Sequence, residues 1–206
     1  MPEMTSIDKS LITGLILAGG RGTRMGTVDK GLQDFRGQPL IQHVLSTLSA
    51  QTDRVIINAN QNLDVYQRFG MPVASDLLTG FPGPLAGLQA GLQACTTPYL
   101  VCTPCDSPLL PADLVNRLAR ALLAECSDVA VAFTMENMDG KPVKQIHPVF
   151  ALMKTDVSVQ LTAYMQGGGR RVNAWHGSLN RSEVLFEDNV AFRNINTLKE
   201  LQELER

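Results

Sequence analysis

The sequence predicts an α/β fold in which helices cover the faces of a mainly parallel β-sheet. Short apolar runs of strand length alternate with longer segments of helical periodicity, and each such helix carries the chain back to the start of the next parallel strand. A second observation is that Gly19, Asn58 and Asp106 stand at the ends of three apolar runs. The length of 206 residues and an apolar share of 44% suit one compact domain.

The predicted elements of the first two thirds follow a regular order. Leu11 to Leu17 is a buried strand, and the glycine-rich loop from Gly19 to Gly31 follows it. Pro39 can be the first residue of the next helix, because the apolar residues behind it recur at helical spacing. Further strands are expected at 54–58, 72–75, 99–103 and 128–133, and further helices at 86–94 and 111–125.

The last third of the chain is less regular. Residues 136–145 are polar and suit either a loop or a hairpin excursion. A strand at 149–153, a helix at 155–166 and a closing amphipathic helix at 197–205 are expected around it. The region of Trp175 and His176 receives no assignment.

Charge and composition exclude several classes of protein. The formal net charge is −2 and basic residues are scattered, so neither nucleic-acid binding nor membrane binding is expected. The first ten residues lack the basic start and apolar centre of a secretory signal, and the apolar run 11–18 is too short to span a bilayer. Together with only four cysteines, these features favour a cytoplasmic protein.

Cys102 and Cys105 have the spacing of a metal or redox pair. A zinc site would need a second pair or histidines at ligand spacing, and a redox pair would open a helix, whereas a proline-bounded turn follows here. Two small buried side chains beside a turn are the favoured interpretation.

The three strand ends predict a ligand site. In open parallel sheets, ligands bind outside the carboxyl ends of the strands, where residues distant in sequence meet. The loop after the first strand adds glycines that let main-chain N–H groups approach a ligand. Arg24 and Lys30 add positive charge suited to phosphates.

Three other interpretations of the loop fit the sequence less well. A P-loop would need Gly-Lys-Ser/Thr, but Lys30 stands between Asp29 and Gly31. A dinucleotide-binding loop would need GxGxxG and an acidic residue after the second strand, where Asn58 stands. A plain connection without chemistry is disfavoured by the two cations in one loop.

The run LAGGRGTRMGTVDKG, Leu17 to Gly31, resembles the signature loop of nucleoside-triphosphate transferases, and its Asp-Lys-Gly ending is similar to that of the molybdenum cofactor guanylyltransferases. The resemblance implies a three-layer Rossmann-like nucleotidyltransferase fold. It departs from the family's closing Asn-Thr-Pro motif, because Leu198 replaces the proline. The other motifs that carry it, in the family's order, are Asn58-Ala-Asn60, Asp76, Pro82 to Gly87, Pro104 to Pro108, His147-Pro148, Gly169-Arg170-Arg171 and Asn194 to Thr197.

The resemblance implies that residues 11–110 bind GTP and Mg2+. Asp106 matches the metal-binding aspartate and is expected at a polar rim, while Arg24 and Lys30 offset charge on the phosphates. Asn58, offering both a donor and an acceptor, and Asp76 are expected near the nucleoside. Main-chain groups of Leu17, Ala18, Gly19 and Gly20 complete the expected nucleotide site.

Residues 111–206 are expected to bind the acceptor, the molybdopterin cofactor. Arg170 and Arg171 are the favoured acceptor contacts, although the local pattern alone equally suits a glycine cap with two solvent-facing arginines. His147, Asn194 and Asn196 are further candidates, and for His147 a structural role is favoured. The resemblance also suggests molybdenum-cofactor biosynthesis proteins and molybdoenzyme chaperones as protein partners of a monomer.

Several alternatives stay open from sequence. A related transferase could use CTP on the same pterin, or act on a sugar phosphate. A GTP-binding protein could deliver cofactor without catalysis, and a dehydrogenase would bind a nicotinamide cofactor. Pyrophosphate release separates the transferases from the delivery protein.

Overall fold

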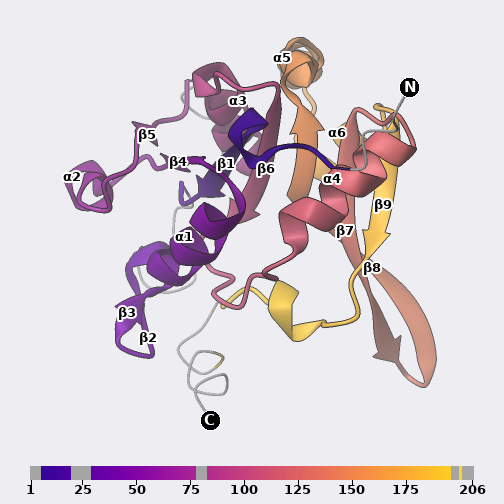
Figure 1. Cartoon of the computed structure of the whole chain (residues 1–206), viewed down its shortest axis with the longest axis horizontal. Helices are drawn as coiled ribbons and strands as arrows, with labels where there is room; N and C mark the ends of the chain where they lie inside the picture. Colours follow the sequence, from indigo (N-terminus) through magenta and orange to yellow (C-terminus); the bar gives the residue numbers. More distant parts are fainter. Residues whose placement is uncertain (1–5, 20–28, 78–82, 196–199, 201–206) are drawn as a thin grey trace.

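The computed structural model describes residues 6–19, 29–77, 83–195 and 200, and its centre is a seven-stranded sheet (Figure 1). The strands are β1 (Ile12–Leu17), β4 (Arg54–Asn58), β5 (Val73–Ala74), β6 (Tyr99–Pro104), β7 (Val129–Met138), β8 (Lys141–Lys154) and β9 (Arg181–Leu185). Their order is β5-β4-β1-β6-β8-β7-β9. β8 runs antiparallel to both neighbours, and the other pairs are parallel. The expected three-layer, mainly parallel fold is confirmed.

Helices cover both faces of this sheet. Helices α1 (Leu40–Gln51) and α4 (Leu114–Ala124) pack on one face, and α3 (Pro84–Ala94), α5 (Ser158–Gln166) and α6 (Val172–His176) pack on the other. The alternation of side chains along β1 explains the two layers, because Ile12 and Ile16 enter the first core and Leu15 enters the second. No helix within the described ranges has the length and apolar content of a membrane span.

Short elements complete the fold. A two-stranded hairpin of β2 (Asp34–Phe35) and β3 (Gln38–Pro39) precedes α1, and its turn places Arg36 and Gly37 at positive φ. Helix α2 (Leu63–Gln67) lies beside β5 at the edge of the sheet (Figure 1). The 3-10 turns are η1 (Lys9–Leu11), η3 (Lys30–Leu32), η4 (Thr155–Val157) and η5 (Val190–Phe192).

The structure corrects the expected elements in several places. The polar segment 136–145 forms the far end of the long β7–β8 hairpin, so the hairpin alternative is confirmed and both strands are longer than expected. Pro39 precedes α1 as its N-cap residue rather than beginning it. Helices α2 and α6 and strand β9 were not predicted, and α6 contains Trp175 and His176. The expected closing helix 197–205 lies almost wholly outside the described residues.

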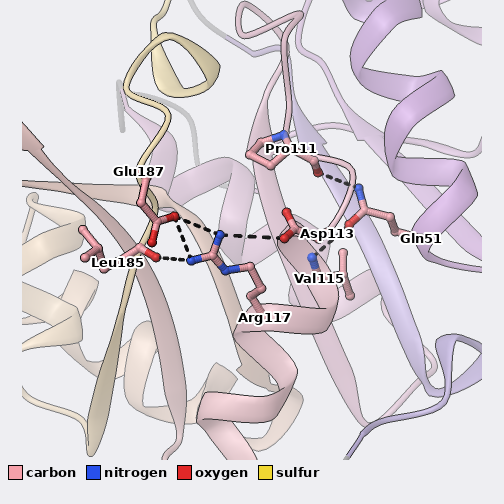
Figure 2. Close-up of polar contacts among 7 residues, drawn as sticks. All are labelled: Gln51, Pro111, Asp113, Val115, Arg117, Leu185 and Glu187. Carbon is pink, nitrogen blue, oxygen red and sulfur yellow. Dashed lines mark hydrogen bonds and ion pairs between the residues drawn. The ribbon is translucent and has the colours of Figure 1, made fainter.

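Polar side chains brace the start of α4, the helix that follows the Asp106 turn. The side chain of Gln51 donates to the Pro111 carbonyl at 3.0 Å and accepts from the Val115 amide at 2.9 Å (Figure 2). Arg117 donates to the Leu185 carbonyl and lies 3.4 Å from the Glu187 carboxylate. These contacts tie α4 to α1 on one side and to the end of β9 on the other.

Candidate functional site

The carboxyl ends of β4, β1 and β6 meet at one edge of the sheet, as expected. Leu17 is in register with Asn58 on one side and with Pro104 on the other. Two main-chain hydrogen bonds continue this alignment beyond the strands, from Ala18 N to Asn58 O at 2.8 Å and from Cys105 N to Leu17 O at 3.1 Å. The predicted nucleotide residues Leu17, Ala18 and Asn58 therefore lie beside the turn that carries Asp106.

A network of asparagines fixes Asp76 at this edge. Asn58 Nδ2 donates to Ala74 O at 3.1 Å and to Asp76 Oδ1 at 3.0 Å. Asn60 Nδ2 donates to Asp76 Oδ2 at 2.8 Å, and Asn60 Oδ1 accepts from the Asp76 amide at 2.8 Å. Both hydrogens of the Asn58 amide are thus used within the protein, and a contact of Asn58 with the nucleoside stays a prediction.

Two glycines make room for Asn58. A Cβ atom at Gly87 would lie 2.1 Å from Asn58 Oδ1, and one at Gly19 would lie 3.0 Å from the same oxygen. Gly87 belongs to the first turn of α3, and Gly19 begins the glycine-rich loop. Both glycines are therefore required for the close packing around the buried amide.

Lys30 and Asp106 face each other across this edge. Lys30 Nζ lies 3.6 Å from Asp106 Oδ2, and the Asp106 side chain is only 11% exposed. Burial raises the pKa of Asp106, and the neighbouring Lys30 ammonium opposes that shift. The Asp106 carboxylate is therefore largely desolvated, and it lies deeper than the polar rim that the sequence predicts.

The Asp106 carboxylate suits a divalent cation. Its second oxygen, Oδ1, is buried and has no hydrogen-bond partner among the described residues. The described residues contain no cluster of three or more His, Cys, Asp or Glu side chains suited to a metal. Mg2+ is commonly held by one or two carboxylates with substrate phosphates and water, so a single buried carboxylate with an unused oxygen fits that ion.

The end of the described chain closes the Asp106 turn. The Ile195 amide donates to Asp106 O at 2.9 Å, and the Ser107 hydroxyl donates to Asn194 Oδ1 at 2.8 Å. Ile195 is buried with Phe35 and Leu40. Asn194, predicted as an acceptor contact, is thereby placed next to the predicted metal-binding residue.

His147 lies in an aromatic cluster on the α1/α4 face. Its Nε2 atom is 2.8 Å from the Thr134 hydroxyl, and its ring stacks on Phe192 with 4.8 Å between centroids. Burial lowers the pKa of His147. These contacts are those expected for a structural histidine, and an acceptor contact stays a prediction.

Arg170 and Arg171 are exposed between α5 and α6, on the opposite face from His147. Gly168, at φ +90°, ends α5, and the amides of Gly168 and Gly169 donate to Met165 O and Tyr164 O. This Schellman motif confirms the glycine cap. Arg170 NH1 also donates to Met165 O at 3.1 Å.

The predicted residues thus fall into three groups. Those of the nucleotide site that are described, including Lys30, Asn58, Asp76 and Asp106, come together at one edge. The predicted acceptor residues come from both faces of the sheet. Gly20, Arg24 and Asn196 lie outside the described residues.

Cys102 and Cys105 are both buried. Burial raises the pKa of Cys102 to about 12, and it also raises the pKa of Cys105. These raised pKa values disfavour the thiolate, which is the form that binds metals and attacks disulfides. The interpretation as small buried side chains is confirmed.

Sequence reasoning assigned no role to three residues near Lys30, namely Asp29, Asn62 and Tyr66. Asp29 is buried, and its carboxylate accepts from the Tyr66 hydroxyl at 2.6 Å and from Asn62 Nδ2 at 3.0 Å. Asn62 and Tyr66 belong to the unpredicted α2 region, so no periodic signal marked them. The one indication in the sequence is Asn62 itself, because asparagine often precedes the first residue of a helix.

Comparison with known sequences supports a transferase fold and family. The family model of the MobA-like NTP transferase domain matches residues 14–180. A molybdenum cofactor guanylyltransferase of Ralstonia nicotianae is 51% identical over 96% of this chain and 98% of its own length. One of Cupriavidus necator is 52% identical over 93% of this chain and 94% of its own.

Solved structures show the same fold. The molybdopterin-guanine dinucleotide biosynthesis protein A of Archaeoglobus fulgidus superposes with a TM-score of 0.75 at 21% identity, over 94% of this chain and 96% of its own. A 4-diphosphocytidyl-2C-methyl-D-erythritol synthase of Anaerococcus prevotii gives 0.74 at 13% identity, over 97% and 96%. Because the family model matches most of the chain and the two relatives match nearly all of it, the chain belongs to the family of MobA-like NTP transferases.

Proposed function

We propose that this protein transfers GMP from GTP to the phosphate of the molybdopterin cofactor and releases pyrophosphate. The two relatives named molybdenum cofactor guanylyltransferase support it, since they match nearly the whole chain at 51% and 52% identity. The structural observation that carries the proposal is the desolvated pair of Lys30 and Asp106 beside the Asn58–Asp76 network. It joins a cation-binding carboxylate and a phosphate-binding ammonium at one strand edge.

The reaction needs no protein nucleophile. An oxygen of the acceptor phosphate forms the new bond to the α-phosphorus of GTP, while the bond from that phosphorus to the β-phosphate oxygen breaks and pyrophosphate leaves. Asp106 would hold Mg2+, which supplies electrostatic stabilisation of the phosphates when bound. Lys30, and Arg24 outside the described residues, offset charge on the leaving phosphates. The remaining work is alignment of the two substrates.

The nucleoside is proposed to lie over the glycine-rich loop, beside Asp76. Both Asp76 oxygens are fixed by asparagines, so this carboxylate is already oriented before a nucleotide arrives. A site built from oriented polar groups rejects a base that leaves those groups unpaired. Together with main-chain groups of residues 17–20, Asp76 should therefore favour GTP over CTP.

The test is a panel of the four nucleoside triphosphates with Mg2+ and purified molybdopterin cofactor, with pyrophosphate release as the measurement. GTP should exceed CTP in kcat/KM by about a hundredfold or more, and omission of the pterin should stop release. Equal or better turnover with CTP would make the protein a cytidylyltransferase. Tight GTP binding without pyrophosphate release would make it a cofactor-delivery protein.

A further inference from the structure

Asp29 is a buried carboxylate that the proposed chemistry does not use. It is 6% exposed, it directly precedes Lys30, and each of its oxygens receives one side-chain donor. The Tyr66 hydroxyl donates to Oδ1 at 2.6 Å, and Asn62 Nδ2 donates to Oδ2 at 3.0 Å. Two side-chain hydrogen bonds of normal length restrict the orientation of this carboxyl group. Asp29 is therefore firmly held at both oxygens.

Both donors come from one short segment. Asn62 is the N-cap residue of α2 and adopts a left-handed conformation, with φ 52° and ψ 35°, which asparagine tolerates better than most residues. Tyr66 lies four residues later on the same helix and is fully buried. Its ring packs near Phe69, with 6.2 Å between the ring centroids. Helix α2 thus presents two donors in a fixed relation.

The same tyrosine also touches the peptide on the other side of Lys30. A Cβ atom at Gly31 would lie 2.7 Å from the Tyr66 hydroxyl oxygen and 3.2 Å from Cys105 Sγ. Cys105 directly precedes Asp106. The Tyr66 hydroxyl therefore lies where the main chain before and after Lys30 comes close to the turn of Asp106.

We propose that Tyr66 and Asn62 are positioning residues that set the place of Lys30 relative to Asp106 by fixing Asp29. The role rests on the proposed function, in which Lys30 and Asp106 act on the phosphates. A lysine side chain has four rotatable bonds, so its ammonium is well placed only if its main chain is held. The clamp on Asp29 and the close packing at Gly31 hold that main chain on both sides.

This role predicts a separation of kcat from KM. Tyr66→Phe keeps the buried ring and the Lys30 charge, so attraction of the nucleotide should persist and the KM for GTP should change less than about twofold. Alignment in the transition state should suffer, and a small misplacement can cost as much as about a hundredfold in rate. We expect kcat to fall about tenfold.

The decisive experiment is a double-mutant cycle of Tyr66→Phe with Lys30→Ala, using GTP, Mg2+ and the pterin cofactor. Lys30→Ala alone should lower kcat/KM, and adding Tyr66→Phe should then change the rate less than about twofold, because the tyrosine acts through the lysine. Tyr99→Phe, at the opposite end of β6, is the matched control and should keep the wild-type rate. Asn62→Ala replaces Tyr66→Phe in the cycle if the latter does not fold.

Each outcome has a distinct meaning. Loss of rate by Tyr66→Phe that is equally large with and without Lys30 would show a general structural role and overturn the proposal. A Tyr66→Phe protein with wild-type turnover would overturn it as well. A wild-type protein that releases no pyrophosphate from any nucleoside triphosphate would instead overturn the proposed function.

Discussion

At the edge formed by β4, β1 and β6, polar side chains bond to one another. The side chains predicted to contact the acceptor mostly bond to groups close to them in the structure. The Asp76 carboxylate accepts hydrogen bonds from Asn58 and Asn60, and Asp106 faces Lys30. Arg170 donates to the carbonyl of Met165, and His147 pairs with Thr134. The edge predicted to bind the nucleotide is thus held by side-chain hydrogen bonds and an ion pair, whereas the side chains predicted to contact the acceptor bond to nearby groups.

The topology explains this difference. Parallel strands end at a common edge, so the residues that follow β1, β4 and β6 are brought together by the sheet itself. β8 is antiparallel, and the β7–β8 hairpin extends beyond the sheet. The part of the chain predicted to bind the acceptor therefore lacks a single line of parallel strand ends, and its candidate residues are distributed over both faces of the sheet.

At the edge formed by β4, β1 and β6, the largest loss of turnover is expected from replacement of Asp106. Asp106→Ala should lower turnover by about a hundredfold or more, because it removes the carboxylate proposed to stabilise charge in the transition state through the metal. The fold should persist, since burial already disfavours the charged form of this group. Pyrophosphate release and thermal unfolding measure the two effects. Near-normal turnover of the folded variant would exclude Asp106 as the metal-binding residue.

In the part of the chain predicted to bind the acceptor, His176 should make stability sensitive to acid. Burial, with a smaller contribution from Arg181, lowers its pKa to about 3, and neither ring nitrogen has a hydrogen-bond partner among the described residues. Below pH 6.5 the imidazole of His176 binds a proton in the unfolded chain but stays neutral in the folded protein. The free energy of unfolding therefore falls as the pH drops from 6.5 toward 3. Between pH 7 and 5 the loss from this group is about 2 kcal/mol.

Urea unfolding at the two pH values measures this loss. His176→Gln should remove that part of the pH dependence, whereas His43→Gln on α1 should leave it in place. Equal pH dependence in wild type and His176→Gln would show that His176 is not responsible.

The smallest expected effect concerns the two arginines after α5. The double variant Arg170→Ala, Arg171→Ala should weaken binding of the pterin cofactor by about tenfold, the scale of one charged contact, and leave GTP affinity unchanged. Calorimetry with each ligand separately measures both. Loss of GTP affinity, or full retention of pterin affinity, would place the acceptor elsewhere and remove the proposed division of the molecule.

The sequence predicted the parallel core well because its strands are apolar runs that end in polar residues. The periodicity of α4 and the β-branched run of β4 left little ambiguity. The resemblance to nucleoside-triphosphate transferases indicated which strand-end residues to examine. Convergence of Asn58 and Asp106 on one edge then followed from parallel pairing alone.

Other features depend on contacts that no local pattern encodes. Helix α2 has five residues and begins from a left-handed Asn62, so it offers no periodic signal. Strand β9 is an edge strand, and its sequence Arg-Ser-Glu-Val-Leu lacks the apolar run of a buried strand. The Asn58 amide donates to Ala74 and Asp76 because β5 lies next to β4. Two glycines leave room for the Asn58 side chain in this position. The hydrogen bonds of the Asp106 turn to Asn194 and Ile195 likewise join residues that are far apart in the sequence.

The bond from Ile195 to the main chain of Asp106 has a consequence for biosynthesis. The ribosome releases the chain from its amino end, and early segments can begin to fold as they emerge. Ser107 and its partner Asn194 are 87 positions apart, so translation passes through β7, β8 and β9 before this turn can be closed. A nascent chain can assemble β1, β4 and β6 first, but its Asp106 turn is complete only after residue 195 has been synthesised.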